Sequence, residues 1–137
     1  MDTLRALRVA DQLPEGTAAR GGPLALALLR GTWYATNPDA GGVVRLDLSG
    51  DDGALRVRAF GAGEPESLDW GEIPATAYGA GVVSSEAMAF SAQYQFDFVT
   101  VLLAAYAKQG ILVLDTFNTF TDGSGRANYF SREFFHR

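Results

Sequence analysis

The chain contains no cysteine and only one histidine among its 137 residues. The absence of cysteine excludes disulfide frameworks, thiolate metal sites and cysteine nucleophiles, and it favours the cytoplasm as the compartment. The histidine, His136, stands one residue from the end of the sequence, and no spacing of carboxylates and histidines indicates a metal site. The glycine-rich segments fit hairpin turns rather than phosphate loops. We therefore expect no metal and no cofactor.

Basic residues and long apolar runs are also scarce. Eleven Lys and Arg stand against sixteen Asp and Glu, which gives a net charge of −5 and no basic cluster for a phosphate backbone. The longest mostly apolar stretch, residues 98–107, is too short to cross a bilayer as a helix. The shorter run at residues 24–29 lacks the cleavage site of a signal peptide. We expect a soluble, cytoplasmic protein with neither nucleic acid nor membrane as partner.

Composition and length are those of one globular domain, with 47% hydrophobic and 20% charged residues. Residues 1–13 carry apolar side chains at three-residue steps, which predicts a short N-terminal helix, and residues 14–23 have the composition of a linker. We expect residues 1–23 to form an arm that is either flexible or a lid, and residues 24–137 to form the domain. Residues 24–29 are predicted to make about one helical turn.

From Gly31 onward, apolar and polar residues alternate with a period of two, which predicts β-strands. Val44, Leu46 and Leu48 share one face of the first clear example, and residues 49–53 have the composition of a tight hairpin turn. Residues 55–59 then continue the alternation, so the two runs should pair antiparallel.

The middle of the chain predicts a longer connection and a weak strand. Residues 61–71 are polar and include Asp69-Trp70-Gly71, so we expect a loop there. Residues 73–78 form a short predicted strand that Pro74 weakens.

The alternation is clearest over residues 87–98, and it leads into another apolar run that ends at Lys108. An uninterrupted strand of that length would span about 70 Å, so a turn or bulge must break it near residues 95–98. Residues 111–120 and 126–135 form a final hairpin around the turn at residues 121–125.

These runs amount to about eight strands with short connections. A sheet of that size removes its exposed edges when it closes, which favours an all-β, single antiparallel up-and-down β-barrel. A two-sheet sandwich is the alternative fold.

The segment Gly31-Thr32-Trp33, followed by a β-only pattern that ends near Arg126 and Arg132, resembles a lipocalin-type (calycin) β-barrel over residues 24–137. In that family a Gly-x-Trp opens the first strand, and its indole plugs the barrel floor beneath an arginine from near the last strand. The resemblance therefore implies a structural role for Trp33, with Arg126 or Arg132 stacked on it. With Asp69-Trp70-Gly71 and residues 121–135, the chain resembles a small uncharacterised bacterial lipocalin-like family, which implies a fold and no activity.

Fatty-acid-binding proteins also open with Gly-x-Trp, but two features argue against that group. Their helical lid follows the first strand, whereas only residues 37–42 separate the first two predicted strands here. They hold a carboxylate with an Arg-x-Tyr pair, whereas Arg126 and Tyr129 are three residues apart and so lie on opposite faces of a strand.

Aromatic side chains are the main candidates for ligand contact. Tyr94, Tyr106 and Tyr129 alternate with apolar neighbours, as does Phe90 on the face of Tyr94, and these rings either grip a planar ligand or fill the core. Trp70 either folds over an apolar patch or lies at the rim of the barrel mouth.

Asp115 lies within an aliphatic and β-branched run, on the face of Ile111, Val113 and Phe117. It is either inside a cavity, as an acid, a base or a ligand anchor, or on an apolar outer surface. The common structural alternative is an ion pair with Arg126 or Arg132 on the adjacent strand, and the same kind of pairing is expected for Glu133.

Three functions follow from the sequence. The first is binding of a small hydrophobic or aromatic molecule in the barrel. The second is a cofactor-independent cyclase or isomerase of natural-product biosynthesis, with residues 1–23 as a lid over a polyene or polyketide, by resemblance to barrel-shaped cyclases. The third is a structural homodimer that buries an apolar outer strand face.

Overall fold

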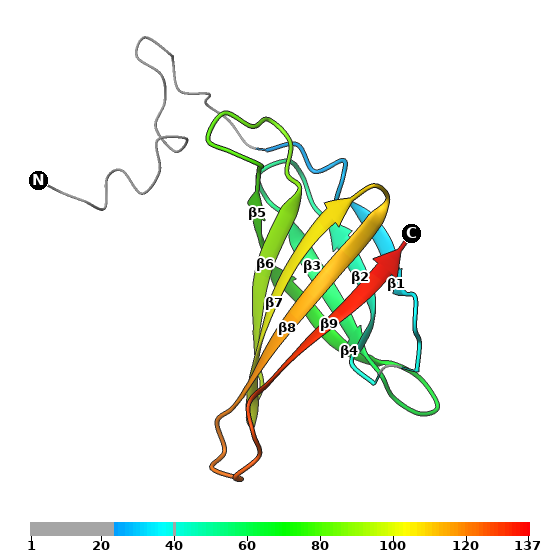
Figure 1. Ribbon diagram of the computed structural model, residues 1–137, viewed down its shortest axis with the longest axis vertical. Helices are drawn as coiled ribbons and strands as arrows, with labels where there is room; N and C mark the ends of the chain where they lie inside the picture. Colours follow the sequence, from blue (N-terminus) through cyan, green and yellow to red (C-terminus); the bar gives the residue numbers. More distant parts are fainter. Residues whose placement is uncertain (1–23, 40) are drawn as a thin grey trace, which may run out of the picture.

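The computed structural model describes residues 24–39 and 41–137, which form one antiparallel sheet of nine strands without a helix (Figure 1). The strands are β1 (Gly31–Ala35), β2 (Val43–Ser49), β3 (Arg56–Gly61), β4 (Leu68–Pro74), β5 (Thr76–Tyr78), β6 (Ala89–Gln95), β7 (Val99–Lys108), β8 (Ile111–Phe120) and β9 (Tyr129–His136). Their order in the sheet is β4-β3-β2-β1-β9-β8-β7-β6-β5. The predicted all-β antiparallel barrel is confirmed, and the predicted helical arm lies outside the described residues.

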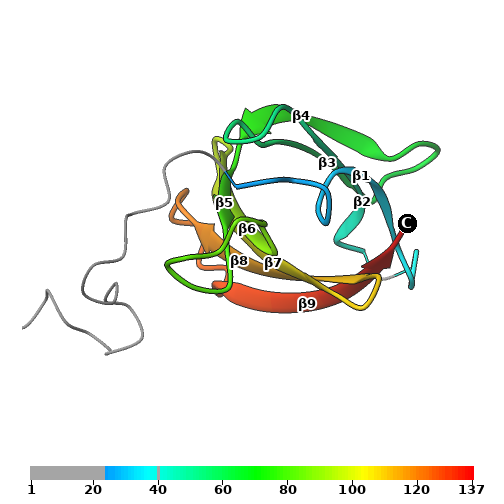
Figure 2. The same cartoon turned by 90° about the horizontal axis from the view of Figure 1, so that it is seen from above.

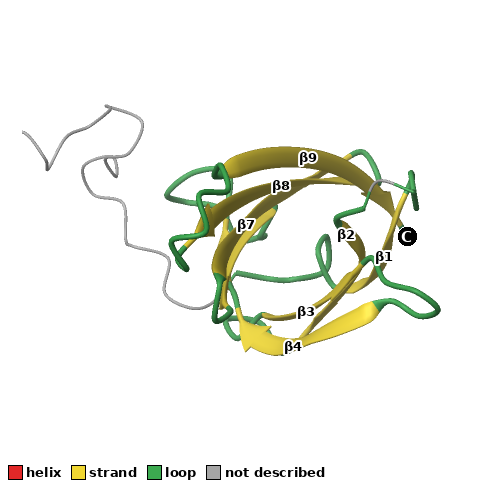
Figure 3. Cartoon of the chain, turned by 90° about the horizontal axis from the view of Figure 1, so that it is seen from below, coloured by secondary structure: helices red, strands yellow, loops and turns green. Residues whose placement is uncertain are grey.

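The barrel is nearly closed because the two outermost strands of the sheet are consecutive in the chain. β4 pairs with β3, β5 pairs with β6, and only Ala75 separates β4 from β5. One extended segment therefore changes neighbour at Pro74, which explains why about eight strands were expected where nine are found. Views along the barrel show the strands around a common interior (Figures 2 and 3).

Two connections show how well local pattern predicts this fold. The expected break near residues 95–98 is a tight turn, in which the Phe96 amide donates a hydrogen bond of 2.9 Å to the Val99 carbonyl. The expected loop at residues 61–71 is shorter than predicted, because β4 begins at Leu68 and includes Trp70. Pairing with β3 holds this polar segment in a strand, and its own composition does not reveal that pairing.

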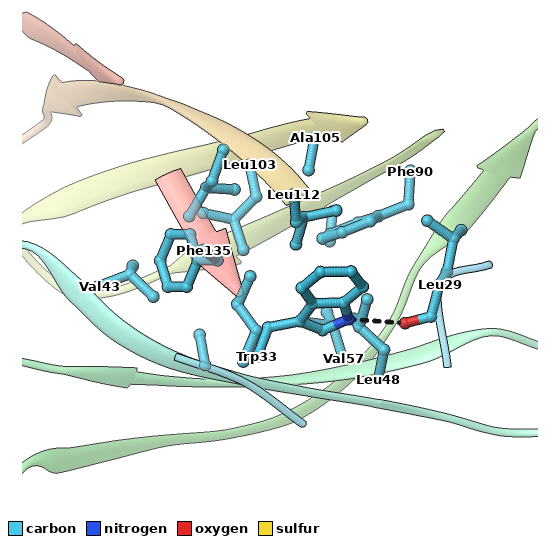
Figure 4. Packing of buried hydrophobic residues seen from close by; sticks show 14 of the residues in the cluster. Leu29, Trp33, Val43, Leu48, Val57, Phe90, Leu103, Ala105, Leu112 and Phe135 are labelled. Carbon is cyan, nitrogen blue, oxygen red and sulfur yellow. Dashed lines mark hydrogen bonds between the residues drawn. The ribbon is translucent and has the colours of Figure 1, made fainter. Parts of the chain in front are cut away.

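A turn at the start of the described chain crosses one end of the barrel (Figure 2). The Arg30 amide donates to the Leu26 carbonyl at 2.8 Å, so residues 24–29 end in a single hydrogen-bonded turn. Trp33 packs beneath this turn with no exposed surface, and its indole Nε1 donates to the Leu29 carbonyl at 2.9 Å (Figure 4). The floor of the barrel is therefore solid.

The arginine on this floor is Arg137, which corrects the expectation of Arg126 or Arg132. Its guanidinium lies 4.4 Å from the Trp33 ring centroid. It also donates to the Arg30 carbonyl at 2.9 Å and the Leu28 carbonyl at 3.3 Å. Arg126 belongs to the β8–β9 loop at the other end of the barrel, and Arg132 points outward from β9.

The core consists of the inward-facing side chains of the strands together with the floor turn. Its largest fully buried members are Trp33, Phe90, Phe135, Leu26, Leu29, Leu46, Leu103, Leu112, Leu114 and Val57. Within the part of the chain that the structure describes, no helix is long and apolar enough to cross a membrane.

Candidate functional site

A cavity of about 600 Å³ opens at the end of the barrel opposite Trp33. The β1–β2, β3–β4, β6–β7 and β8–β9 connections surround this end, which Figure 3 shows with β7, β8 and β9 on one side of the interior and β3 and β4 on the other. The cavity is lined by Gly41, Gly42, Val43, Gly61, Ala62, Leu68, Trp70, Phe96, Phe98, Val99, Val101, Thr116, Asn118, Phe120, Arg126, Tyr129, Ser131 and Glu133.

One wall of the cavity is apolar and aromatic. The Trp70 ring lies edge-on to Phe96, with ring centroids 5.4 Å apart, and Trp70 meets Tyr94 at the same distance. Tyr94 and Phe96 are parallel, with centroids 5.8 Å apart. Such packing restricts each ring to one orientation, so this wall presents a preformed surface to a flat apolar molecule.

Tyr94 supports this wall from behind through its hydroxyl group. The Ala59 amide donates to the hydroxyl at 3.0 Å, and the hydroxyl donates to the Gly71 carbonyl at 2.7 Å. Both backbone groups belong to an irregularity in the β3–β4 pairing, where Gly71 adopts a φ of +89°. Burial raises the pKa of Tyr94 above its ordinary value, so the hydroxyl stays protonated as a donor.

The opposite wall, from β8 and β9, is polar. The Thr116 and Ser131 hydroxyls lie 2.5 Å apart, and Asn118 Nδ2 donates to Thr116 Oγ1 at 3.2 Å and to the Tyr129 carbonyl at 3.3 Å. Thr116 and Asn118 are the two buried polar residues among those described, and both line the cavity. No described residue donates to Asn118 Oδ1, which leaves it as an acceptor for a ligand.

Arg126 forms part of the rim and is held there by ring contacts and hydrogen bonds. Its guanidinium lies 4.3 Å from the Phe120 ring centroid and 5.4 Å from that of Phe98. It also donates to Asp122 Oδ2 at 2.7 Å and to the Ser124 hydroxyl at 2.9 Å. Hydrogen bonds from Ser124, aided by Arg126, lower the pKa of Asp122, which keeps this cluster ionised. The cluster fixes the β8–β9 loop against Phe98 and Phe120.

The cavity also extends toward a side of the barrel where strand pairing is incomplete. β1 pairs with β9 only at Ala35↔Phe135 and Tyr34↔His136, so Tyr129, Ser131 and Glu133 have no β1 partner. Gly41 and Gly42 line the cavity near this seam, and a Cβ atom added to either would meet nothing within 4 Å. These glycines leave open space beside the polar wall.

The structure separates the residues that the sequence nominated for ligand contact. Trp70 and Tyr129 line the cavity, whereas Tyr94 stands behind it and Phe90 packs in the core near the floor (Figure 4). Tyr106 lies on the outer face of β7 and does not reach the interior. Sequence alternation defines two faces of a strand, and it does not say which one turns inward.

Asp115 lies on the outer face of β8, which decides among the alternatives left open by the sequence. Its two carboxylate oxygens accept hydrogen bonds of 2.6 and 2.9 Å from Arg132 on β9. These hydrogen bonds lower the pKa of Asp115, and the carboxylate is a surface ion pair with no access to the cavity.

Sequence reasoning missed the polar wall as a unit. Thr116 and Asn118 continue the inward face of Leu112 and Leu114, and Ser131 and Glu133 alternate with outward residues of β9. The switch from apolar to polar along one strand face was the available signal, because it marks where a core becomes a cavity.

His136 lies away from this site. His136 points outward, with its ring 6.4 Å from that of Tyr34. No group of three or more potential metal ligands is present in residues 24–39 and 41–137.

Comparison with family models, with curated protein sequences and with solved structures finds no match to this chain.

Proposed function

We propose that this protein is a lipocalin-like barrel that binds a small hydrophobic or aromatic molecule in the cavity at its open end. The observation that carries the proposal is the cavity itself, whose 600 Å³ falls within the range of small-molecule sites. An aromatic wall faces a small number of polar groups, the combination that holds and orients such a ligand. The solid floor with Trp33 and Arg137 supports the lipocalin-like assignment.

Binding requires only the shape and polarity of this cavity, whereas cyclisation would also require a cavity that stabilises a transition state more strongly than the bound molecule. For that reason binding, rather than the cyclase alternative, is the function we propose.

A pair of variants on β7 tests the proposal. Val101 lines the cavity, and Leu102, its neighbour, points outward with 38% of its surface exposed. Val101→Trp should fill part of the cavity and weaken binding of the neutral fluorescent probe N-phenyl-1-naphthylamine by about tenfold or more. Leu102→Trp makes a similar enlargement outside the barrel, so its affinity should match that of the parent protein.

The measurement is the rise in probe fluorescence on titration, with melting temperatures recorded to confirm that both variants fold. Equal probe affinity in the Val101→Trp variant would show that the probe binds elsewhere, and would contradict the proposed site.

A second candidate function, assembly into a homodimer, is favoured by the outer face of β7, β8 and β9. Six large apolar side chains are at least 38% exposed there: Leu102, Tyr106, Ile111, Phe117, Phe130 and Phe134. The Asp115–Arg132 ion pair lies among them, so a second copy related by a two-fold axis could offer each charge its opposite. A continuous exposed apolar patch is typical of an interface.

Sedimentation velocity tests the dimer. Phe117→Lys should convert a dimer to a monomer, whereas Val83→Lys, an exposed apolar residue of the β5–β6 connection, should leave the mass unchanged. A parent protein that is monomeric at about 100 µM would refute the homodimer.

A further inference from the structure

Glu133 is the one carboxylate among the inward-facing side chains of the nine strands. Along β9 it shares a face with Ser131 and the buried Phe135, while Arg132 and Phe134 point outward. Its side chain lines the cavity on the stretch of β9 that β1 leaves unpaired.

No basic residue within the described ranges pairs with Glu133. Arg132, its neighbour in sequence, bonds to Asp115 on the outer surface. Arg126, the basic residue of the cavity lining, bonds to Asp122 at 2.7 Å. A half-buried carboxylate loses part of its hydration, and a positive group in the cavity would compensate that loss.

The loops around the open end add negative charge. Asp39, Glu64, Glu66, Asp97 and Asp122 belong to these four connections, against Arg126 alone. A mouth with an excess of one sign of charge concentrates ligands of the opposite sign and repels ligands of its own.

The aromatic wall complements the carboxylate. Trp70, Phe96 and Phe98 offer apolar surface to the body of a ligand, and the faces of such rings also attract cations. The hydroxyls of Thr116 and Ser131, together with Asn118 Oδ1, offer acceptors for the N–H groups of an ammonium ion.

We propose that the cavity selects small organic cations, which have an apolar or aromatic body and a protonated amine, and that the carboxylate of Glu133 anchors the amine. This inference rests on the proposed ligand-binding function and specifies its ligand class.

Three probes share a naphthalene ring and differ in the charge of the terminal group, so they separate the effect of charge from that of shape. They are 2-(2-naphthyl)ethylamine, 2-(2-naphthyl)ethanol and 2-naphthylacetate. Their affinities for the full chain are measured by isothermal titration calorimetry at neutral pH. The amine should bind about ten- to a hundredfold more tightly than the alcohol, because a charge-assisted hydrogen bond replaces a neutral one. The acetate should bind more weakly than the alcohol, and added salt should reduce the preference for the amine.

The variant Glu133→Gln tests the anchor with a side chain of nearly equal size. It should abolish the preference for the amine while leaving the affinity for the alcohol unchanged, which also shows that the cavity remains intact. Glu72→Gln is the matched control, since Glu72 is exposed on β4 and pairs with Arg56 outside the barrel at 2.8 Å. It removes the same charge and should keep most of the preference.

Each outcome is decisive. Binding of all three probes with equal affinity, or an amine preference that survives in Glu133→Gln, would overturn the cationic ligand class and leave the binding function standing. Tighter binding of the acetate would also overturn it, in favour of Arg126 as the anchor. If none of the three probes bound at about 1 mM, both the ligand-binding function and the cationic ligand class would be overturned.

Discussion

Arg137 stacks on the indole of Trp33 and ties the end of β9 to the turn that enters β1. The guanidinium covers the ring at 4.4 Å from its centroid and bonds to the carbonyls of Arg30 and Leu28. Strand β1 pairs with β9 over only two residue pairs, so this side-chain contact strengthens the shortest strand pairing of the sheet. It also makes one end of the molecule solid and leaves the other end for a cavity.

Arg137→Ala should therefore lower the free energy of unfolding by about 1–2 kcal/mol, since a cation–π contact and two hydrogen bonds are lost together. Urea denaturation measures this change. Arg132→Ala removes an exposed arginine of β9 and should have the smaller effect. If the two variants lost equal stability, the contact of Arg137 with Trp33 would not be what holds the end of β9 to the turn before β1.

Tyr94→Phe should lower the free energy of unfolding by about 2 kcal/mol, because it leaves the buried Ala59 amide and the half-buried Gly71 carbonyl without their partner. Tyr78→Phe is the control, since the Tyr78 hydroxyl bonds to Ser91 at an exposed site and its loss should be nearly neutral. The denaturation midpoints of the two variants are compared. A Tyr94→Phe midpoint equal to that of Tyr78→Phe would show that the Tyr94 hydroxyl does not stabilise the β3–β4 pairing.

The raised pKa of Tyr94 also predicts a loss of stability at alkaline pH. Below about pH 10 the hydroxyl is protonated in both states, and above it the unfolded chain releases the proton while the folded protein retains it. The folded protein then binds more protons, so its stability falls as pH rises above 10. The stability gap between the parent protein and Tyr94→Phe, measured from pH 8 to 11, should narrow over this range; a constant gap would contradict the burial of this group.

Two glycines of the cavity wall should differ in their response to a methyl group. A Cβ at Gly61 would lie 2.7 Å from the indole Nε1 of Trp70, whereas a Cβ at Gly42 would meet nothing within 4 Å. Gly61→Ala should displace the Trp70 ring, shift its fluorescence emission and weaken probe binding. Gly42→Ala should leave the Trp70 emission and the probe affinity unchanged. An unchanged emission spectrum in Gly61→Ala would show that the Trp70 ring does not depend on this close approach.

The strand pattern was predictable because alternation and turn composition act over a few residues. The turn between β6 and β7 followed from strand length alone, and it is confirmed. The site was less predictable, because β7 is apolar on both faces. Val101 and Leu102 look alike in sequence, yet one lines the cavity and the other faces outward.

The choice of arginine shows the same limit. Three arginines follow residue 125, and the spacing along β9 does not say which of them reaches Trp33. The β8–β9 register, with Asp115 opposite Arg132 and Val113 opposite Phe134, turns Arg132 outward, and the end of β9 carries Arg137 to the floor.

By itself, the sequence determined an antiparallel β-protein with its turns near their observed positions, because local backbone preferences and two-residue alternation suffice for that. Only the tertiary structure decided which strand faces enclose the interior, that Trp70 lies in a strand, and that Glu133 faces a cavity while Asp115 does not. Those outcomes depend on pairing between residues far apart in the chain, and closure of the sheet selects one face of every strand at once.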